Sequence, residues 1–466
     1  MHGAFLFMPY ALERHSLEAL RTALDMLERG FAGLPAAATP QLGRDGERVL
    51  VDVAERLHDN YPYFHPLYAG QMLKPPHPVA RAAAALADWV NPNNHALDGG
   101  RASSALEKEA VAQLAAMVGW DAHLGHLTSG GTMANLEALW VAGKLAPGQR
   151  IAASRQAHYT HERISGVLGL DFVAIDADRR GRMSMEALEH QLRAGGIGTV
   201  VATLGTTAVG AVDPLPRILE LCERYGARVH VDAAYGGYFK LAGNLAAESR
   251  AAFDRMEGAD SVVIDPHKHG LQPYGCGCVL FRDPSVGRFY RHDSPYTYFS
   301  SAELHLGEIS LECSRPGAAA VALWATQRLL PLVQGGEFAR LLERSRAAAL
   351  ALHARLAANP RFVTAFAPEL DIVVWAPKAA SAAEASARSR AIFEACARRG
   401  LHLAVAQLPV AFFDHDEALA GAEGASIACL RSVLMKPEHL DWVDRIASIL
   451  DAATDEAVAR GAALPS

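Results

Sequence analysis

The chain has 466 residues, of which 50% are hydrophobic and 20% are charged, and its formal net charge is −7 at pH 7. This length exceeds what one simple domain needs, so we expect one large domain and one smaller domain in close association. Because charges of both signs are mixed along the chain, the sequence lacks the basic surface that nucleic acids or anionic membranes require, and a small molecule is the expected partner.

The first 95 residues predict a helical and pocket-lining segment. Residues 1 to about 60 carry leucines near helical spacing, such as Leu17, Leu20 and Leu24. The stretch 61–80 is rich in prolines and aromatic residues, which exclude a regular helix or a central strand and favour a connector or a pocket lining. The apolar residues 5–8 lack the basic leader and cleavage site of a secretory signal, so we expect a cytoplasmic protein.

From about residue 105, helical and strand patterns alternate, which is typical of a mainly parallel sheet with helices on both faces. We assign residues 96–335 to this large α/β domain. The uncharged run 194–212 is long enough to cross a membrane, but its glycines and threonines favour a buried strand followed by a loop. The predicted strands cover residues 199–204, 228–233, 261–264 and 278–282, and the predicted helices cover residues 105–118, 133–144, 214–225 and 318–330.

Residues 336–466, after two adjacent glycines, mix helices with short strands such as 371–375 and predict a smaller α+β domain. Residues 409–426 predict a loop, in which the acidic and histidine side chains at 414–417 favour a solvated turn over a metal site. The six cysteines form no zinc-type CxxC pair, so we expect reduced thiols and no metal site.

The residues that suit chemistry follow predicted strands, where open α/β sheets bind their ligands. Lys268 leaves a strand between His267 and His269, and lysine forms Schiff bases with carbonyl cofactors, although a salt-bridged loop lysine is the alternative. Asp232 ends an otherwise apolar strand, and a buried carboxylate needs a partner, such as a protonated pyridine nitrogen. Ala234 leaves room beside it for a flat ring.

Two further motifs would complete a cofactor site. The Gly-Gly-Thr turn at 130–132 leads into a helix and offers backbone N–H groups and the positive helix end to a phosphate, with a simple N-cap at Thr132 as the alternative. His158 follows a short strand and could stack on an aromatic ring or serve a structural role alone.

Five motifs, TSGGTMAN, QAHYTH, TLGTTAVGAVD, HVDAAYGG and DPHKHG, together resemble the ordered signature of the group II pyridoxal-phosphate decarboxylases, over about residues 60–330. This family includes the glutamate, aromatic amino acid and archaeal tyrosine/aspartate decarboxylases, and it has fold type I of the PLP-dependent transferases. The resemblance implies pyridoxal 5'-phosphate as cofactor, decarboxylation of a small L-amino acid, and a homodimer with the active site at its interface.

The same resemblance implies roles for the matching residues. Lys268 would form the Schiff base with the cofactor, and Asp232 would pair with its pyridine nitrogen. Ala234 and His158 would lie on the two faces of the ring, and His158 could assist protonation. The remaining assignments are Gly131, Thr132 and His267 at the phosphate, Thr206 near the phenolic oxygen, and Arg431 at the substrate α-carboxylate, the last with a surface arginine as the alternative.

The sequence leaves the proton donor and the substrate open. Animal aromatic decarboxylases carry a tyrosine in a mobile loop, whereas the matching stretch here, SSAELHLGEIS, has none. His305 is the nearest acid in that stretch, and Tyr296 and Tyr298 lie just upstream. Phe64 and its aromatic neighbours would suit a tyrosine-like substrate, whereas His65 could receive an acidic one such as aspartate or glutamate.

Other activities need the same lysine and aspartate. A C–C lyase of the sphingosine-phosphate-lyase type, an aromatic aldehyde synthase and an aminotransferase are the alternatives within this fold type. An aldehyde synthase would consume oxygen and release an aldehyde instead of an amine. A non-catalytic binder of the cofactor is disfavoured, because the lysine, the aspartate and the stacking histidine are all present.

Overall fold

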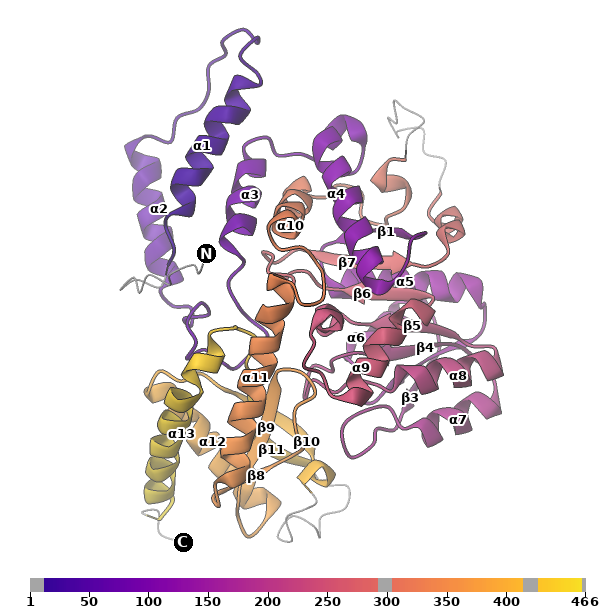
Figure 1. Cartoon of the computed structure of the whole chain (residues 1–466), viewed down its shortest axis with the longest axis vertical. Helices are drawn as coiled ribbons and strands as arrows, with labels where there is room; N and C mark the ends of the chain where they lie inside the picture. The colour runs from indigo at the N-terminus through magenta and orange to yellow at the C-terminus, as the bar shows by residue number, and fades with distance from the viewer. Residues whose placement is uncertain (1–11, 292–303, 414–425, 463–466) are drawn as a thin grey trace.

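The computed structural model describes residues 12–291, 304–413 and 426–462. Figure 1 shows an α/β body around one large sheet, a smaller sheet with long helices beside it, and an N-terminal pair of helices at the edge. This arrangement confirms the predicted fold class of a mainly parallel large sheet with a smaller α+β part.

The large sheet has seven strands in the order β1-β7-β6-β5-β4-β2-β3. The strands β6, β5, β4, β2 and β3 run parallel, and β7 is antiparallel to both of its neighbours. Every residue of β4 is buried, and its sequence, IGTVVAT, shows no alternation between apolar and charged residues. The bounds are β1 Leu124–Thr128, β2 Arg150–Ser154, β3 Phe172–Ile175, β4 Ile197–Thr203, β5 Arg228–Asp232, β6 Ser261–Ile264 and β7 Gly277–Phe281.

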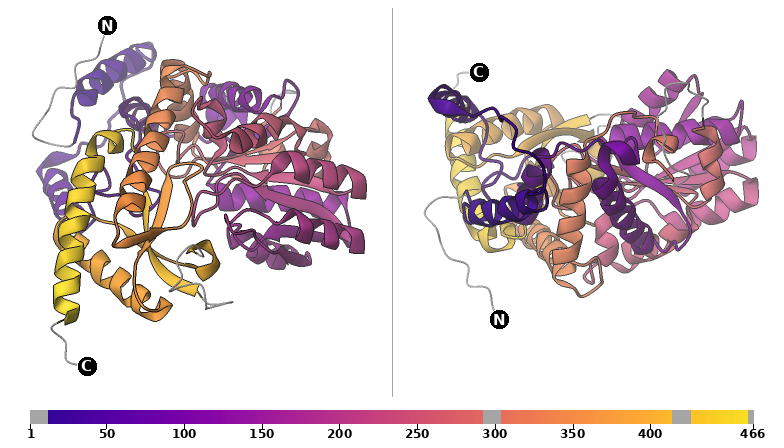
Figure 2. Two further views of the ribbon diagram at one scale, coloured as in Figure 1. Left: turned by 60° about the horizontal axis from the view of Figure 1, so that its bottom comes forward. Right: turned by 90° about the horizontal axis from the view of Figure 1, so that it is seen from above.

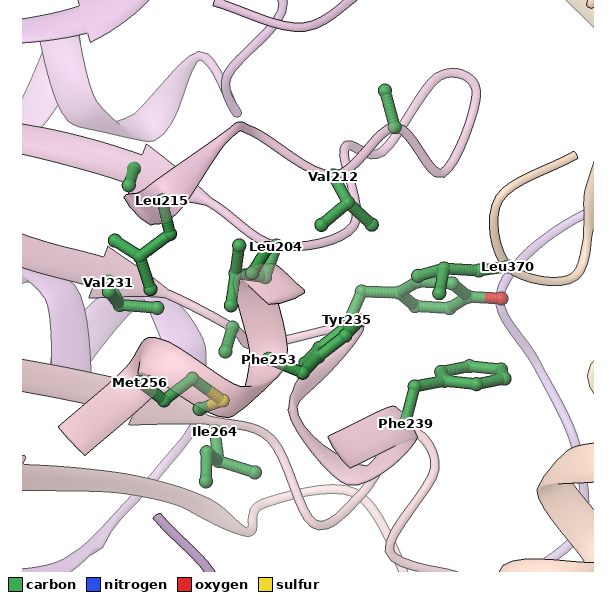
Figure 3. Packing of buried hydrophobic residues seen from close by; sticks show 14 of the residues in the cluster. Leu204, Val212, Leu215, Val231, Tyr235, Phe239, Phe253, Met256, Ile264 and Leu370 are labelled. Carbon is green, nitrogen blue, oxygen red and sulfur yellow. The ribbon is translucent and has the colours of Figure 1, made fainter. Parts of the chain in front are cut away.

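Helices cover both faces of this sheet (Figure 2). In α8 the buried residues Leu215, Ile218, Leu221 and Cys222 recur at helical spacing, so one face of the helix packs into the core as predicted. Figure 3 shows this core, in which side chains from the ends of β4, β5 and β6 meet those of the helices. The helices are α4 Leu97–Val118, α5 Gly131–Leu145, α6 Thr160–Leu168, α7 Met185–Ala194, α8 Leu215–Tyr225, α9 Ala247–Asp254 and α10 Gly317–Leu329, with short 3₁₀ turns at η1 Gly237–Leu241, η2 Arg255–Gly258, η3 Pro284–Phe289 and η4 Leu306–Glu308.

The smaller sheet has four antiparallel strands in the order β10-β11-β9-β8. Three long helices pack with it around a second apolar cluster that includes the fully buried Trp375. The elements are α11 Glu337–Ala358, β8 Phe362–Thr364, β9 Ile372–Pro377, α12 Ala382–Arg398, β10 Ala404–Pro409, η5 Val410–Phe413, β11 Ser426–Val433 and α13 His439–Ala462.

The N-terminal helices are α1 Ser16–Arg29, α2 Gly43–Leu57 and α3 Pro78–Asp88. No residue of α1 or α2 is buried, and both helices expose large apolar side chains. The irregular stretch between α2 and α3 reaches the small sheet, because the amide of Ala69 donates to the carbonyl of His402 at 2.9 Å. Among the described residues, no helix is both long and apolar enough to cross a membrane.

Candidate active site

A cavity of about 310 Å³ opens at the carboxyl ends of the parallel strands, where open α/β sheets place their ligands. Asp232 closes β5, Lys268 follows β6, and His158 follows β2. The register pairs Thr203 with Asp232 and Asp232 with Val263, so the ends of β4, β5 and β6 lie side by side at this edge. The cavity is lined by Ser129, Gly130, Gly131, Thr132, Met133, Asn135, His158, Thr160, Thr203, Gly205, Thr207, Asp232, Ala234, Tyr235, Asp265, His267 and Lys268.

Lys268 forms an ion pair at one side of the cavity. Its Nζ lies 3.1 Å from Oδ2 of Asp265, a carboxylate that is 2% exposed. Within the described residues, Oδ1 of Asp265 has no hydrogen-bond partner, so this buried carboxylate can still accept a hydrogen bond. His267 lies 3.6 Å from the same carboxylate, and burial lowers the pKa of its ring although Asp265 opposes that shift.

Asp232 accepts two hydrogen bonds beside the cavity. Nε2 of His161 lies 2.8 Å from its Oδ2, and the amide of Ala234 donates to Oδ1 at 3.1 Å. Burial raises the pKa of the Asp232 carboxyl, but the His161 hydrogen bond and the charge of Lys268 outweigh burial, so the net pKa lies well below its usual value. Asp232 is therefore an anion held ready for a cationic partner.

His158 faces the same cavity as a neutral ring. Burial lowers the pKa of His158, and the charge of Asp232 only partly opposes this. Its Nδ1 lies 3.3 Å from the donating amide of Thr160 and 2.8 Å from the hydroxyl of the same residue. Since Nδ1 accepts a hydrogen bond, the ring hydrogen of neutral His158 is assigned to Nε2.

The glycine turn before α5 brings the backbone close to Asp265. Gly130 has φ of 154°, a conformation that side chains rarely adopt, and a Cβ on Gly131 would lie 2.5 Å from Oδ2 of Asp265. Asn135 braces the turn by donating to the carbonyl of Gly131 at 2.8 Å, and His230 contacts the amide oxygen of Asn135 at 2.8 Å. The first turn of α5 therefore presents free backbone N–H groups at the cavity.

Seven of the predicted site residues line this one cavity, although they come from four separate stretches of the chain. They are Gly131, Thr132, His158, Asp232, Ala234, His267 and Lys268. Sequence reasoning missed His161 and Asp265, which hold Asp232 and Lys268. Sequence spacing could have identified both, because His161 lies three positions after His158 and Asp265 lies three positions before Lys268.

Thr206 and Arg431 are placed differently from the prediction. Thr206 is fully buried and its hydroxyl accepts from the amide of Ala211 at 3.0 Å, so Thr207 lines the cavity in its place. Arg431 is 5% exposed and lies outside the cavity lining. Its guanidinium donates to the carbonyls of Thr207, Ala208 and Gly70 at 2.6, 2.9 and 3.0 Å, because a buried guanidinium takes the nearest acceptors.

His305, Phe64 and His65 also lie outside the cavity lining. His305 is fully buried, and its Nδ1 accepts from the amide of Leu97 at 3.1 Å, so in this chain it caps the first turn of α4. His65 accepts from the amide of Leu67 at 3.1 Å and packs edge-on against Trp442. Tyr296, Tyr298 and the acidic cluster at 414–417 fall outside the described residues.

The cavity fits pyridoxal phosphate. A cofactor with a carbonyl, a basic ring nitrogen and a phosphate finds here a lysine amine, a buried anion and a helix N-terminus, all lining one space. The small side chain of Ala234 lines the same space, which leaves room for a planar ring. Among the described residues, no cluster of histidine, cysteine or acidic side chains has a metal-binding geometry.

Comparison with known proteins decides the family. Residues 34–378 match the model of the pyridoxal-dependent decarboxylase conserved domain. The chain belongs to this family. It is accordingly a pyridoxal-phosphate-dependent amino acid decarboxylase.

Three similar proteins illustrate the relationship of this decarboxylase to known ones. L-aspartate decarboxylase of Thermococcus kodakarensis is 30% identical over 61% of this chain and 73% of its own length. The probable L-tyrosine/L-aspartate decarboxylase of Methanothermobacter thermautotrophicus is 29% identical over 56% of this chain and 70% of its own length. The crystal structure of mouse CSAD superposes with a TM-score of 0.76 at 24% identity, over 95% of this chain and 92% of that chain, and this likeness shows the fold.

Proposed function

We propose that this decarboxylase acts on an acidic L-amino acid, with aspartate as the first candidate, and releases carbon dioxide and the amine. The observation that carries the proposal is that Lys268 and Asp232 line one cavity, each with a buried partner of its own. The two relatives described above are named for aspartate or for tyrosine and aspartate.

The charges behind the cavity favour an acidic substrate over an aromatic one. Tyr235 lines the cavity, and burial and the anion Asp371 raise its pKa, whereas Arg431 opposes that shift. Lys74 acts on Asp371, so two cations and one anion lie behind this wall. Burial lowers the pKa of Lys74 to about 8, so it remains largely protonated at pH 7. Positive charges near the cavity attract an anionic substrate.

The aromatic side chains of the stretch 61–68 are engaged elsewhere. Tyr63 packs edge-on against Tyr68 with ring centroids 4.9 Å apart, and Tyr61 lies 4.7 Å from the ring of His402. Phe64 is 38% exposed. These rings therefore contact one another and the small domain, which weakens the case for a tyrosine-like substrate, although tyrosine stays the second candidate.

The reaction requires an acceptor for the electrons of the bond that breaks. Bound pyridoxal phosphate supplies an electron-accepting ring conjugated to the substrate α-carbon. Lys268 would hold it covalently, and Asp265, 3.1 Å from Nζ, would orient the lysine side chain. Asp232, kept anionic by His161, would hold a proton on the ring nitrogen, and the amides of Gly131 and Thr132 would bind the phosphate.

Return of a proton to the α-carbon completes the reaction. His158 is the candidate donor, because it lines the cavity and its assigned hydrogen is on Nε2, away from Thr160. His305, the donor expected from the sequence, does not line the cavity, so we propose His158 in its place. A His158→Asn variant should bind the cofactor and lose turnover, and unchanged turnover would exclude His158 as the donor.

We also propose that the chain works as a homodimer. The helices α1 and α2 hold no buried residue, and they expose Leu17, Met26 and Val51 at 62%, 66% and 58%, respectively. Two amphipathic helices with uncovered apolar side chains fit a second copy of the chain. Light scattering should give twice the 49.8 kDa of one chain, and a fully active monomer would refute this.

The substrate is tested with a panel of amino acids and added cofactor. We expect aspartate to release equal amounts of carbon dioxide and amine, with glutamate and tyrosine much slower. Oxygen uptake with aldehyde formation would identify an aldehyde synthase instead. Release of carbon dioxide from tyrosine alone would make the second candidate the substrate.

A further inference from the structure

A buried cluster of three polar side chains joins the small domain to the wall of the cavity. The hydroxyl of Tyr235 donates to Oδ1 of Asp371 at 2.6 Å, and Nε2 of His269 lies 3.2 Å from Oδ2 of the same carboxylate. The exposed fractions are 3% for Tyr235, 1% for His269 and 0% for Asp371. Polar groups are costly to bury unless they are paired, and the hydrogen bond from Tyr235 pairs one oxygen of the Asp371 carboxylate.

The cluster joins residues that lie far apart in the sequence. Asp371 directly precedes β9 of the small sheet, whereas Tyr235 comes three residues after Asp232 and His269 is the neighbour of Lys268. Tyr235 lines the cavity, and Figure 3 shows its hydroxyl pointing away from the core of the large sheet, beside Leu370.

We propose that Asp371 is a positioning residue of the active site: from the small domain it fixes the ring of Tyr235 against the cavity and the segment that carries Lys268. This inference rests on the proposed function for its effect on turnover. Asp371 is not itself part of the cavity lining, so it acts through Tyr235, which is, and through His269, the neighbour of Lys268.

The protonation states suit this role. Burial raises the pKa of the Asp371 carboxyl, but His269, Tyr235 and Lys74 outweigh it and leave the net pKa below the usual value. Burial lowers the pKa of His269, so its ring is neutral, with Nε2 at 3.2 Å from the Asp371 carboxylate. The other charges that act on the cluster are Lys74, Lys268 and Arg431, all cations.

The geometry also determines what Tyr235 does. Because its hydroxyl hydrogen is given to Asp371, Tyr235 presents its ring to the cavity and is not available as an acid there. His269 is held between the rings of Tyr235 and Phe239, at 4.7 and 4.9 Å from their centroids. Loss of the Asp371 carboxylate would remove the contacts that hold Tyr235 and His269 in place. The backbone next to Lys268 would then be less firmly positioned.

The test compares Asp371→Asn, Tyr235→Phe and their double variant with a matched control, Glu369→Gln. Glu369 is 2% exposed and belongs to the same junction, but it pairs with Arg182 and accepts from the amide of Val212, away from Tyr235 and His269. Each cofactor-loaded protein is titrated with pH in the absence of substrate, and the absorbance of the cofactor on Lys268 gives the pH midpoint. The values of kcat and KM are then measured separately.

We expect Asp371→Asn to lower the pH midpoint of that absorbance change by at least about 0.3 units, because it removes an anion near a cation. It should lower kcat about tenfold with KM within about threefold, since the group acts by positioning and not by binding substrate. The double variant should be no worse than the more impaired single variant, as expected for residues that act as one unit. Glu369→Gln should lower the melting temperature. It should leave the pH midpoint unchanged and keep kcat within about twofold of wild type.

The proposal is overturned if Asp371→Asn changes the midpoint and kcat no more than Glu369→Gln does, or if the losses of Asp371→Asn and Tyr235→Phe simply add. The midpoint is read without substrate. A wild type that loads cofactor but releases carbon dioxide from no amino acid would therefore refute the proposed function and still leave Asp371 to be judged by its titration.

Discussion

Replacing His161 by phenylalanine tests how Asp232 is held. The change removes the Nε2 hydrogen bond of 2.8 Å and leaves the carboxylate with one donor, the amide of Ala234 at 3.1 Å. A hydrogen bond to a charged group contributes about 1.5–3 kcal/mol, so the cofactor-free variant should lose about 2 kcal/mol of unfolding free energy and melt several degrees earlier. The measurement is thermal or urea unfolding of the cofactor-free protein.

The pH dependence of this loss has a definite sign. The pKa of folded Asp232 is lowered below its unfolded value, so its stabilisation is present at neutral pH and disappears as the pH falls. The gap between wild type and His161→Phe should therefore be widest at neutral pH and should begin to narrow below about pH 5. Saturating cofactor should also narrow the gap, because a ring nitrogen would give Asp232 a new partner.

A matched control is His126→Phe. His126 is also fully buried and lies 3.0 Å from a buried carboxylate, that of Glu137, but neither residue lines the cavity. Its loss of stability should be the same with and without cofactor. If cofactor likewise leaves the difference in unfolding free energy between wild type and His161→Phe unchanged, the assignment of Asp232 to the ring nitrogen is wrong.

Three further predictions concern the lysine, the glycine turn and a buried ion pair. Lys268→Ala should abolish the absorbance of bound cofactor and lower carbon dioxide release by about 10³-fold or more; full turnover would end the proposed chemistry. Gly131→Ala should weaken cofactor binding about tenfold, because the added methyl meets a carboxylate oxygen at 2.5 Å, whereas Gly166→Ala, with open space around it, should bind as wild type. Arg315→Met should cost about 3–5 kcal/mol of unfolding free energy, since it strands the buried Glu107 at 2.8 Å; a melting point within a degree of wild type would contradict this.

The sequence predicted the large sheet well because its signals are local. A parallel strand buried on both faces reads as a short β-branched run, and the amphipathic spacing of α8 identifies the helix that covers it. Chemistry-bearing residues follow such strands directly, and Asp232 and Lys268 could be found in that way without knowing how the strands are ordered.

The contacts that fix those residues could not be predicted because they join distant segments. The guanidinium of Arg431 donates to backbone carbonyls that lie 361, 223 and 224 positions away in the sequence. Only the folded chain shows that these carbonyls occupy the N–H groups that were expected to bind the substrate carboxylate. His305 was chosen as the nearest acid in its stretch, yet its ring meets an amide 208 positions away. Sequence distance from a motif says little about distance from the cavity.

The small domain contributes to the site through such distant contacts. Asp371 reaches the residues after β5 and β6, and Arg431 holds the backbone of Thr207, another residue of the cavity lining. Both side chains are buried and charged, so displacing the small domain would break these contacts and remove them from the cavity wall. We therefore expect the cavity that holds Lys268 to keep its shape only while the two domains stay docked, and we expect loss of Asp371 or Arg431 to alter turnover before it unfolds the large sheet.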